Sequence, residues 1–334
     1  MALLLYWYDS FCFAIVTVAV AGSIWVLHGS DRVRPSHSNR STINESLRDR
    51  VRVSNRVSQV SHSRPWMSCW AGLHPAWLLA GRAASGLAMA VMLGWDIHTY
   101  GFYVMIYYTG WTFMLVIIYF VLATIISAHG CWSYLRRDVS QSEERNEFLK
   151  GDMEDSNPDA ETCRIDKNAD DTEWQSQQKH EDNEQRAGFL GYAVQIIYQT
   201  CAGAVLLTDI VFWCVIVPFM SSDQFKLSLL MGCMHSLNLV FLLIDTALNS
   251  LQFPLFRMAY FVLWSCAYII FQWVLHACGF SWWPYPFLEL DTPWAPLWYF
   301  GMALVHIPCY GVYALAVKAK VLFFSRFFPH AFIK

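Results

Sequence analysis

Residues 226–249 read KLSLLMGCMHSLNLVFLLIDTALN, a stretch that is long and apolar enough to cross a lipid bilayer as one helix. Its polar positions are Ser228, His235, Asn238, Asp245 and Asn249. At about 100° per residue they fall within an arc of roughly 100°, and so they form one polar stripe on an otherwise apolar helix. Ionisable groups at membrane depth are costly unless they face protein or water. The stripe therefore predicts neighbouring helices that pair with it.

The composition of the whole chain agrees with this prediction. Of the 334 residues, 56% are hydrophobic and 15% are charged, and the mean hydropathy is +0.32. A soluble protein is about a quarter charged, so these values indicate a polytopic membrane protein. The ten cysteines lie mainly inside apolar segments without regular spacing, which favours packing roles over a disulfide framework. The net charge of −3 gives no sign of a nucleic-acid partner.

We expect an all-α integral membrane protein with seven transmembrane helices, made of a six-helix core and an N-terminal anchor helix. The expected spans cover residues 3–27, 76–95, 103–128, 188–218, 226–249, 255–278 and 294–317. The chain then divides into an N-terminal transmembrane anchor (1–28), a basic cytoplasmic linker (29–72), transmembrane helices two and three (73–137), an acidic disordered cytoplasmic loop (138–186), transmembrane helices four to seven (187–320) and a cytoplasmic tail (321–334).

The acidic loop holds 16 of the 26 acidic residues of the chain and very few aromatic residues. A segment of this kind does not bury a core, and we expect it to be disordered. It is also the segment in which we expect a cytoplasmic protein partner to bind, if the protein has one.

The distribution of basic residues predicts the orientation. With the N-terminus outside and the C-terminus inside, 21 of the 23 lysines and arginines fall in cytoplasmic segments. Lys226 is then extracytoplasmic and Arg82 intramembrane. Asn39 and Asn44 begin glycosylation sequons, but a cytoplasmic linker leaves them unmodified.

The aromatic segment 282–299, WWPYPFLELDTPWAPLWY, lies between the last two expected spans. Its four prolines disfavour a regular helix, and its Trp and Tyr rings suit the headgroup layer. We expect an interfacial cap over the bundle, and the alternative is a lid that guides a lipid into a cavity.

Candidate catalytic residues emerge from a comparison of depths. Thr112, Asp209 and His235 each lie nine residues from the outer end of their expected spans, which places all three about 13 Å below that surface. Thr109 lies one turn shallower than Thr112 on the same helix face. A hydroxyl, an imidazole and a carboxylate at one level are the groups of a nucleophilic hydrolase. The alternative is that these residues only hydrogen-bond helices together.

Other histidines and charged residues of the expected spans also share depths. His276 and His306 belong to the same outer half, so either is an alternative to His235. At the cytoplasmic level Arg82 and Asp245 share a depth, and we expect them to form a buried ion pair. No paired-histidine metal spacing, glycine-rich phosphate loop or nucleotide fingerprint occurs in the chain, and we expect no metal and no cofactor.

The chain resembles the rolling-stone-like multi-pass membrane proteins, especially their plant members, over spans two to seven. The stretches that carry the resemblance are YYTGWTFMLVIIYF (107–120), HSLNLVFLLIDTALN (235–249), the aromatic segment 282–299 and HIPCYGVYALAVKAK (306–320). The plant members bring no assigned biochemistry that this resemblance carries over.

A more distant resemblance is to the androgen-induced and androgen-dependent membrane proteins, six-span threonine hydrolases that cleave fatty-acid esters of hydroxy fatty acids. That resemblance matches the family's threonine to Thr112 in WTF or to Thr109, and its histidine to His235 in MHSLN. The chain departs from these hydrolases in its additional first span and its acidic loop. Asp209 comes from the comparison of depths and not from the resemblance.

The sequence thus predicts a multi-pass protein of the endoplasmic reticulum or plasma membrane that contacts membrane lipids. The leading biochemical hypothesis is that the protein is an intramembrane lipid-ester hydrolase with Thr112 or Thr109 as nucleophile and His235 as general base. Asp209 is then the group that orients His235. The alternative is a non-enzymatic membrane scaffold or an adhesion or signalling component.

Overall fold

The computed structural model describes residues 6–32, 66–154, 169–219 and 228–333, and within these ranges the regular elements are helices. The long helices are α1 (Asp9–Arg32), α3 (Pro75–Tyr100), α4 (Tyr108–Glu154), α5 (Ala169–Val211), α7 (Leu229–Leu248), α8 (Met258–Ala277) and α9 (Ala295–Phe327). The short elements are η1 (Gly101–Ile106), η2 (Phe212–Ile216), α6 (Val217–Phe219), η3 (Leu255–Arg257) and η4 (Pro286–Leu288). The expected all-α class is confirmed.

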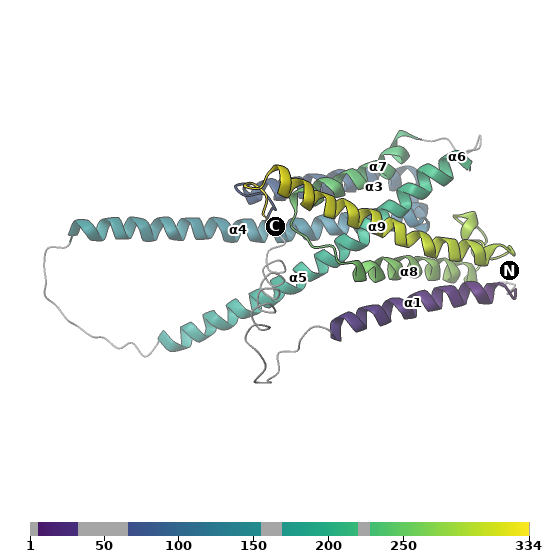
Figure 1. Cartoon of the computed structure of the whole chain (residues 1–334), viewed down its shortest axis with the longest axis horizontal. Coiled ribbons are helices and arrows are strands. Elements are labelled where there is room, and N and C mark those ends of the chain that lie inside the picture. The colour runs from purple at the N-terminus through teal and green to yellow at the C-terminus, as the bar shows by residue number, and fades with distance from the viewer. Residues whose placement is uncertain (1–5, 33–65, 155–168, 220–227, 334) are drawn as a thin grey trace.

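Seven helical segments of the described chain are long and apolar enough to cross a membrane. They cover Asp9–Ser30, Pro75–Ile106, Tyr108–Arg136, Gly188–Phe219, Leu229–Leu248, Leu255–Ala277 and Ala295–Phe327. Each overlaps one of the spans expected from the sequence, so the seven expected helices are confirmed, and they are compatible with a multi-pass membrane protein. The described chain begins at one end of the bundle and finishes at the other, an arrangement compatible with an odd number of crossings (Figure 1).

Helices α4 and α5 extend beyond the rest of the bundle at the end where the C-terminus lies (Figure 1). The sequence predicted disorder between 138 and 186, and the structure describes residues 138–154 and 169–186 as helical continuations of α4 and α5. The physical reason is that each further residue adds one hydrogen bond to a helix that is already nucleated. These segments are rich in Glu, Gln, Lys and Arg, which are good helix formers.

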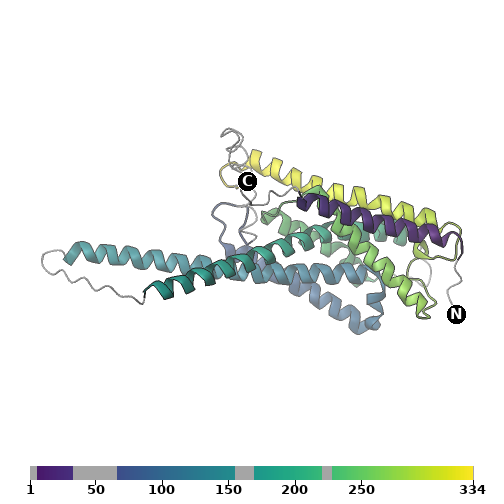
Figure 2. The same cartoon turned by 90° about the horizontal axis from the view of Figure 1, so that it is seen from below.

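The helices form two packed groups. The core of one group is built by α3, α4, α5 and α7, around side chains such as Met89, Phe120 and Tyr198. The core of the other is built mainly by α1, α8, α9 and the segment that contains η4, around side chains such as Phe261 and Tyr310. Figure 2 shows α1 and α9 along one side of the molecule and α3 and α4 along the other.

The polar stripe of α7 faces the interior, where its side chains pair with those of neighbouring helices. Arg82 of α3 donates from Nε to Asp245 Oδ1 at 2.8 Å, and its Nη1 donates to Ser127 Oγ at 2.7 Å. Tyr119 and Asn249 both donate to the second oxygen of Asp245. The expected ion pair between Arg82 and Asp245 is confirmed, and it joins α3 to α7. The hydrogen bonds of Ser127 and Tyr119 connect the pair to α4.

Residues 66–72 pack against the end of the bundle where the C-terminus lies. Ser68 and Asn249 form an antiparallel bridge, as do Trp70 and Phe332. The indole nitrogen of Trp70 also donates to Ala247 O at 3.1 Å. The sequence assigned these parts to a linker (29–72) and a tail (321–334), and in the structure residues 66–72 and Phe332 pack against one another at this end. The sequons at Asn39 and Asn44 lie outside the described residues.

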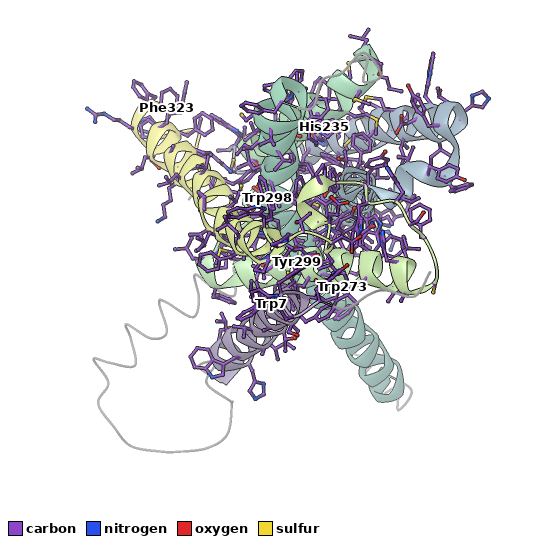
Figure 3. The ribbon with its side chains drawn as sticks, turned by 90° about the vertical axis from the view of Figure 1, so that its right-hand side faces the viewer. Trp7, His235, Trp273, Trp298, Tyr299 and Phe323 are labelled. Atoms are coloured by element: carbon purple, nitrogen blue, oxygen red, sulfur yellow. The ribbon has the colours of Figure 1, made fainter. Side chains whose placement is uncertain are left out.

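At the opposite end, the aromatic segment 282–299 folds over the bundle with Tyr285, Phe287 and Leu288 buried. Tyr299 ties this segment to the helices, because it accepts a hydrogen bond from Trp273 Nε1 at 3.0 Å and donates to Leu288 O at 3.0 Å. Figure 3 views the molecule from this end and shows Trp7, Trp273 and Tyr299 gathered where α1, α8 and α9 meet. The segment therefore closes one end of the bundle, as the expected cap would.

Candidate active site

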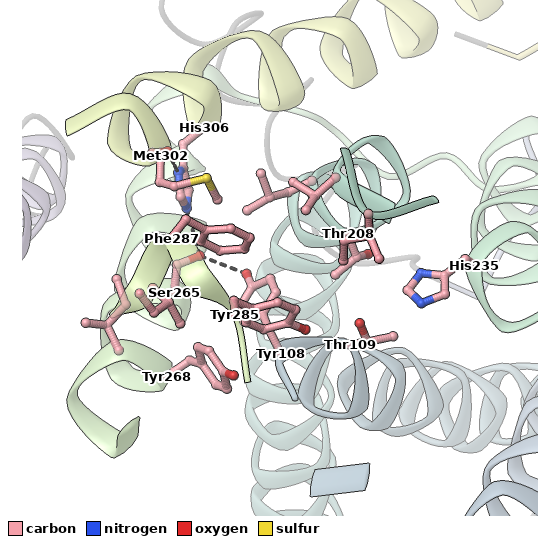
Figure 4. Close-up of a pocket in the computed structure, with 15 residues that line it drawn as sticks. Tyr108, Thr109, Thr208, His235, Ser265, Tyr268, Tyr285, Phe287, Met302 and His306 are labelled. Carbon is pink, nitrogen blue, oxygen red and sulfur yellow. Dashed lines mark hydrogen bonds between the residues drawn. The ribbon is translucent and has the colours of Figure 1, made fainter. Parts of the chain in front are cut away.

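A cavity of about 60 Å³ lies between the two packed groups of helices. By volume it holds roughly four water molecules. It is lined by residues of α4, α5, η2, α7, α8, η4 and α9 and by Tyr285, which precedes η4. The full lining is Tyr108, Thr109, Leu207, Thr208, Val211, Ile216, His235, Ser265, Tyr268, Ile269, Tyr285, Phe287, Leu288, Met302 and His306 (Figure 4). The described lining includes no Asp, Glu, Lys or Arg, so the cavity suits a neutral ligand with a small polar group.

His235 reaches this cavity from a kink in α7. Its own backbone leaves the helical range, with φ −92° and ψ 17°, and its carbonyl accepts a hydrogen bond from Trp213 Nε1 at 3.0 Å. The imidazole stacks on Phe212, with the ring centroids 3.7 Å apart. Phe212 begins the π-helical turn η2, a kind of irregularity that recurs at functional sites. Two irregular helix segments thus fix the orientation of the His235 ring.

Asp209 lies beside His235, as their shared depth predicted. Its Oδ1 is 3.8 Å from His235 Nδ1 and accepts a hydrogen bond from Asn238 Nδ2 at 3.2 Å. The distance of 3.8 Å exceeds a hydrogen bond, although contacts between catalytic groups are often looser without a bound substrate. Both Asp209 and His235 are more than nine-tenths buried. The pair is therefore an imidazole and a carboxylate in contact inside the helix bundle.

The two candidate threonines occupy different environments. Thr109 lines the cavity, and the close-up shows its side chain pointing toward the end of the cavity where His235 lies (Figure 4). Thr112 is fully buried and is absent from the cavity lining. Of the two, Thr109 is thus the residue that shares a cavity with His235.

Tyr285, which comes from the aromatic segment, covers Thr109. Burial raises the pKa of the Tyr285 phenol to about 12, and a hydrogen bond with Thr109 opposes part of that rise. The phenol is therefore neutral at physiological pH and remains a hydrogen-bond donor next to the Thr109 hydroxyl. The aromatic segment thus supplies a wall of the cavity in addition to capping the bundle.

The two remaining candidate histidines, His306 and His276, have different surroundings. His306 of α9 lines the cavity, whereas His276 does not and instead stacks on Trp283 with centroids 3.5 Å apart. The sequence offered His306 only as an alternative to His235, and in the structure its partners differ from those of His235. Its Nε2 lies 2.8 Å from Ser265 Oγ, which in turn lies 2.8 Å from the Tyr108 hydroxyl.

Ser265 and Tyr108 were not among the candidates from the sequence. Ser265 stands in the apolar stretch VLWSCAY of span six, and a single serine in a transmembrane helix usually hydrogen-bonds its own backbone. Only the rotation of α8 against α4 and α9 brings it to His306 and Tyr108, and hydropathy carries no information about that rotation. The position of Tyr108 next to Thr109 is the one feature of the sequence that could have indicated it as a site residue. Aromatic residues are common at span ends, however, so this feature is weak.

The described residues contain no group of three or more His, Cys, Asp or Glu side chains able to hold a metal ion. The cavity and its surroundings offer hydroxyl and imidazole groups together with the buried carboxylate of Asp209. Comparisons of the chain with protein-family models, with curated proteins and with solved structures returned no match.

Proposed function

We propose that this protein is an intramembrane hydrolase of lipid esters, with Thr109 as nucleophile, His235 as general base and Asp209 as the group that orients His235. The observation that carries the proposal is that a hydroxyl and an imidazole from different helices line one cavity inside a bundle of membrane-spanning helices. The distant resemblance to intramembrane threonine hydrolases supports the same residue types.

The proposed reaction has two steps. His235 takes the hydroxyl proton of Thr109 while Oγ1 attacks the acyl carbon, and the alcohol leaves with that proton. The resulting threonyl ester is then hydrolysed by water, for which His235 is again the base, and the carboxylic acid is released. Asp209 acts on the other ring nitrogen, where its carboxylate favours the imidazolium that forms during each step.

The cavity also constrains the substrate. Its side walls are apolar, with Leu207, Val211, Ile216 and Ile269 among them. Its volume accommodates an ester group and a few methylene groups, so most of an acyl chain lies outside it, along the apolar helices. The lining described has no charged side chain to offset a charged headgroup. Because burying an unpaired charge is costly, a charged headgroup is disfavoured in this cavity. A neutral ester of a long-chain fatty acid fits these conditions.

A second candidate function is a non-enzymatic membrane scaffold. The specific observation that favours it is that most of the polar stripe of α7 already bonds neighbouring helices, through Asn238 to Asp209 and through Asp245 to Arg82. Under this alternative, residues 138–186 bind a cytoplasmic protein partner, and deleting them removes function while leaving the bundle folded. Under the hydrolase proposal the same deletion leaves ester turnover unchanged.

The test is ester hydrolysis by the purified full-length chain in detergent, with a panel of neutral long-chain esters and product analysis by mass spectrometry. His235→Phe is the informative variant, because a phenyl ring retains the stack on Phe212 and lacks the basic nitrogen. We expect turnover to fall by roughly 100-fold or more. His98→Ala is the matched control, since His98 is exposed on α3 and does not line the cavity.

Abundance and melting temperature are measured for each variant in the same preparations. Unchanged turnover in a folded His235→Phe variant contradicts the proposal. Loss of folding in that variant, together with a wild type that hydrolyses no ester of the panel, supports the scaffold instead.

A further inference from the structure

The strongest nucleophile geometry in the cavity belongs to a different pair. Ser265 of α8 and His306 of α9 lie on the side of the cavity away from His235, with Tyr108 between them and Thr109 (Figure 4). The distance from Ser265 Oγ to His306 Nε2 is 2.8 Å. A nucleophile and its base are recognised by a contact of this length.

The hydrogen-bond network determines where the protons lie. His306 Nδ1 is 2.7 Å from Met302 O, a carbonyl that only accepts, so Nδ1 carries the ring proton. Nε2 then presents a lone pair, and the hydroxyl of Ser265 donates to it at 2.8 Å in preference to Phe261 O, which is farther away at 3.3 Å. The Tyr108 hydroxyl, 2.8 Å from Ser265 Oγ, donates to that oxygen in turn. This tautomer is the one that a general base acting on Ser265 requires.

The imidazole of His306 is also held in place by packing. Phe261 lies against it, with ring centroids 4.5 Å apart. Phe261 in turn fits over Gly203 of α5, where a Cβ would meet its ring at 2.5 Å. The missing side chain at Gly203 thus lets Phe261 sit where it orients His306. Preorganisation of this kind is what a catalytic base needs.

We propose that Ser265 and His306 form a second acyl-accepting site in the cavity, in which Ser265 is the nucleophile, His306 its general base and Tyr108 a donor to the reacting oxygen. Ser265 Oγ forms a bond to the acyl carbon of an ester, and the bond from that carbon to the alkoxy oxygen breaks. The Ser265 proton passes to His306 Nε2 and then to the departing alcohol. Water later hydrolyses the seryl ester, which releases the acid and restores Ser265.

This proposal stands on different residues from the Thr109 and His235 site. Both sites take an acyl ester, because they line the same apolar cavity, but neither contributes a side chain to the other. The competing explanation is structural, with Ser265 linking α8 to α9 and α4 only as a helix–helix hydrogen bond. A structural serine with no activated hydroxyl does not react covalently with an acyl or phosphonyl electrophile.

The test is covalent modification of the full-length wild type in detergent by a long-chain alkyl fluorophosphonate. Attack by Ser265 forms an oxygen–phosphorus bond and releases fluoride and a proton. The adduct is located by mass spectrometry of peptides. We expect it on Ser265, with the labelling rate lowered about 100-fold by His306→Ala, as for loss of a general base. Ser133→Ala is the matched control, since Ser133 lies on α4 away from the cavity lining.

The outcomes separate the two sites. An adduct on Ser265 together with unchanged hydrolysis in Thr109→Ala supports this inference and contradicts the proposed function. An adduct on Thr109 without one on Ser265 supports the proposed function and contradicts this inference. A folded wild type without any Ser265 adduct overturns the inference, and this outcome does not depend on whether the His306 variant folds.

Discussion

Asp245 of α7 and Arg82 of α3 form a buried ion pair, with Arg82 Nε 2.8 Å from Asp245 Oδ1 and each side chain at most 3% exposed. His235 lies ten residues earlier on the same helix, about 15 Å along its axis. The ion pair therefore fixes one level of α7, while the candidate chemistry occupies another. The ion pair and the proposed catalysis thus depend on different residues of one helix.

Removal of one partner of this ion pair should be strongly destabilising. Asp245→Leu leaves the Arg82 charge buried without its carboxylate, at an expected loss of roughly 3–5 kcal/mol of unfolding free energy. The measurement is thermal or denaturant unfolding of the purified protein in one detergent. Combined with Arg82→Met, the same substitution should recover most of the loss, because an apolar pair replaces an ionic one. A single variant that melts with the wild type contradicts this prediction.

Gly203 should tolerate no side chain. A Cβ at this position would meet the ring of Phe261 within 2.5 Å, so α5 and α8 must separate or Phe261 must turn. We expect Gly203→Ala to cost about 1–3 kcal/mol, as for overpacking of a core. Gly311→Ala is the matched control, because nothing lies within 4 Å of the Cβ it adds. Equal melting temperatures for the two variants would show that the contact between α5 and α8 is looser than described.

The proposed orientation predicts which cysteine an impermeant maleimide labels in intact cells. Cys278 is exposed just after α8, at the end of the bundle proposed to face outside. Labelling of intact cells should fall in Cys278→Ser. If that thiol reacts only after permeabilisation, the orientation is reversed. Cys69 should react slowly in either case, since burial raises the pKa of its thiol and so lowers the thiolate fraction.

Asp209 should affect the rate of ester hydrolysis more than substrate binding. Asp209→Asn retains the size of the side chain and its contact with Asn238, but removes the negative charge next to His235 Nδ1. We expect kcat to fall by roughly tenfold to 100-fold with little change in KM, because the charge favours the imidazolium formed during proton transfer. The measurement is steady-state hydrolysis of an ester that the wild type turns over. A rise in KM with unchanged kcat would instead assign Asp209 to substrate binding.

Much of the fold could be predicted from the sequence because hydrophobic length alone identifies a membrane-spanning helix. The ion pair between Arg82 and Asp245 could be predicted as well, since two buried charges of opposite sign at one depth have few other partners. The helical course of residues 138–154 could not, because it depends on propagation from α4 and not on an apolar core.

The candidate site was predictable only in part. Depth along the helix axis predicted that Asp209 and His235 lie together. Depth says nothing about how a helix is rotated about its axis, and the rotation of α4 determines that Thr109 and not Thr112 lines the cavity. The kink at His235 and the π-helical turn at Phe212 are local departures from helical geometry that no periodicity in the sequence signals. Ser265 was missed for the same reason, since its partners Tyr108 and His306 come from two other helices.

The most direct test of the central claim is a comparison of Thr109→Ala with Thr112→Ala in ester hydrolysis by the folded full-length protein. The two substitutions remove the same atoms one turn apart on α4, from a residue that lines the cavity and from one that does not. We predict that Thr109→Ala lowers kcat/KM by roughly tenfold or more and that Thr112→Ala leaves it within about twofold. Any activity that remains in Thr109→Ala should disappear when Ser265→Ala is added. Equal rates for the wild type and Thr109→Ala would contradict the claim that Thr109 is the nucleophile.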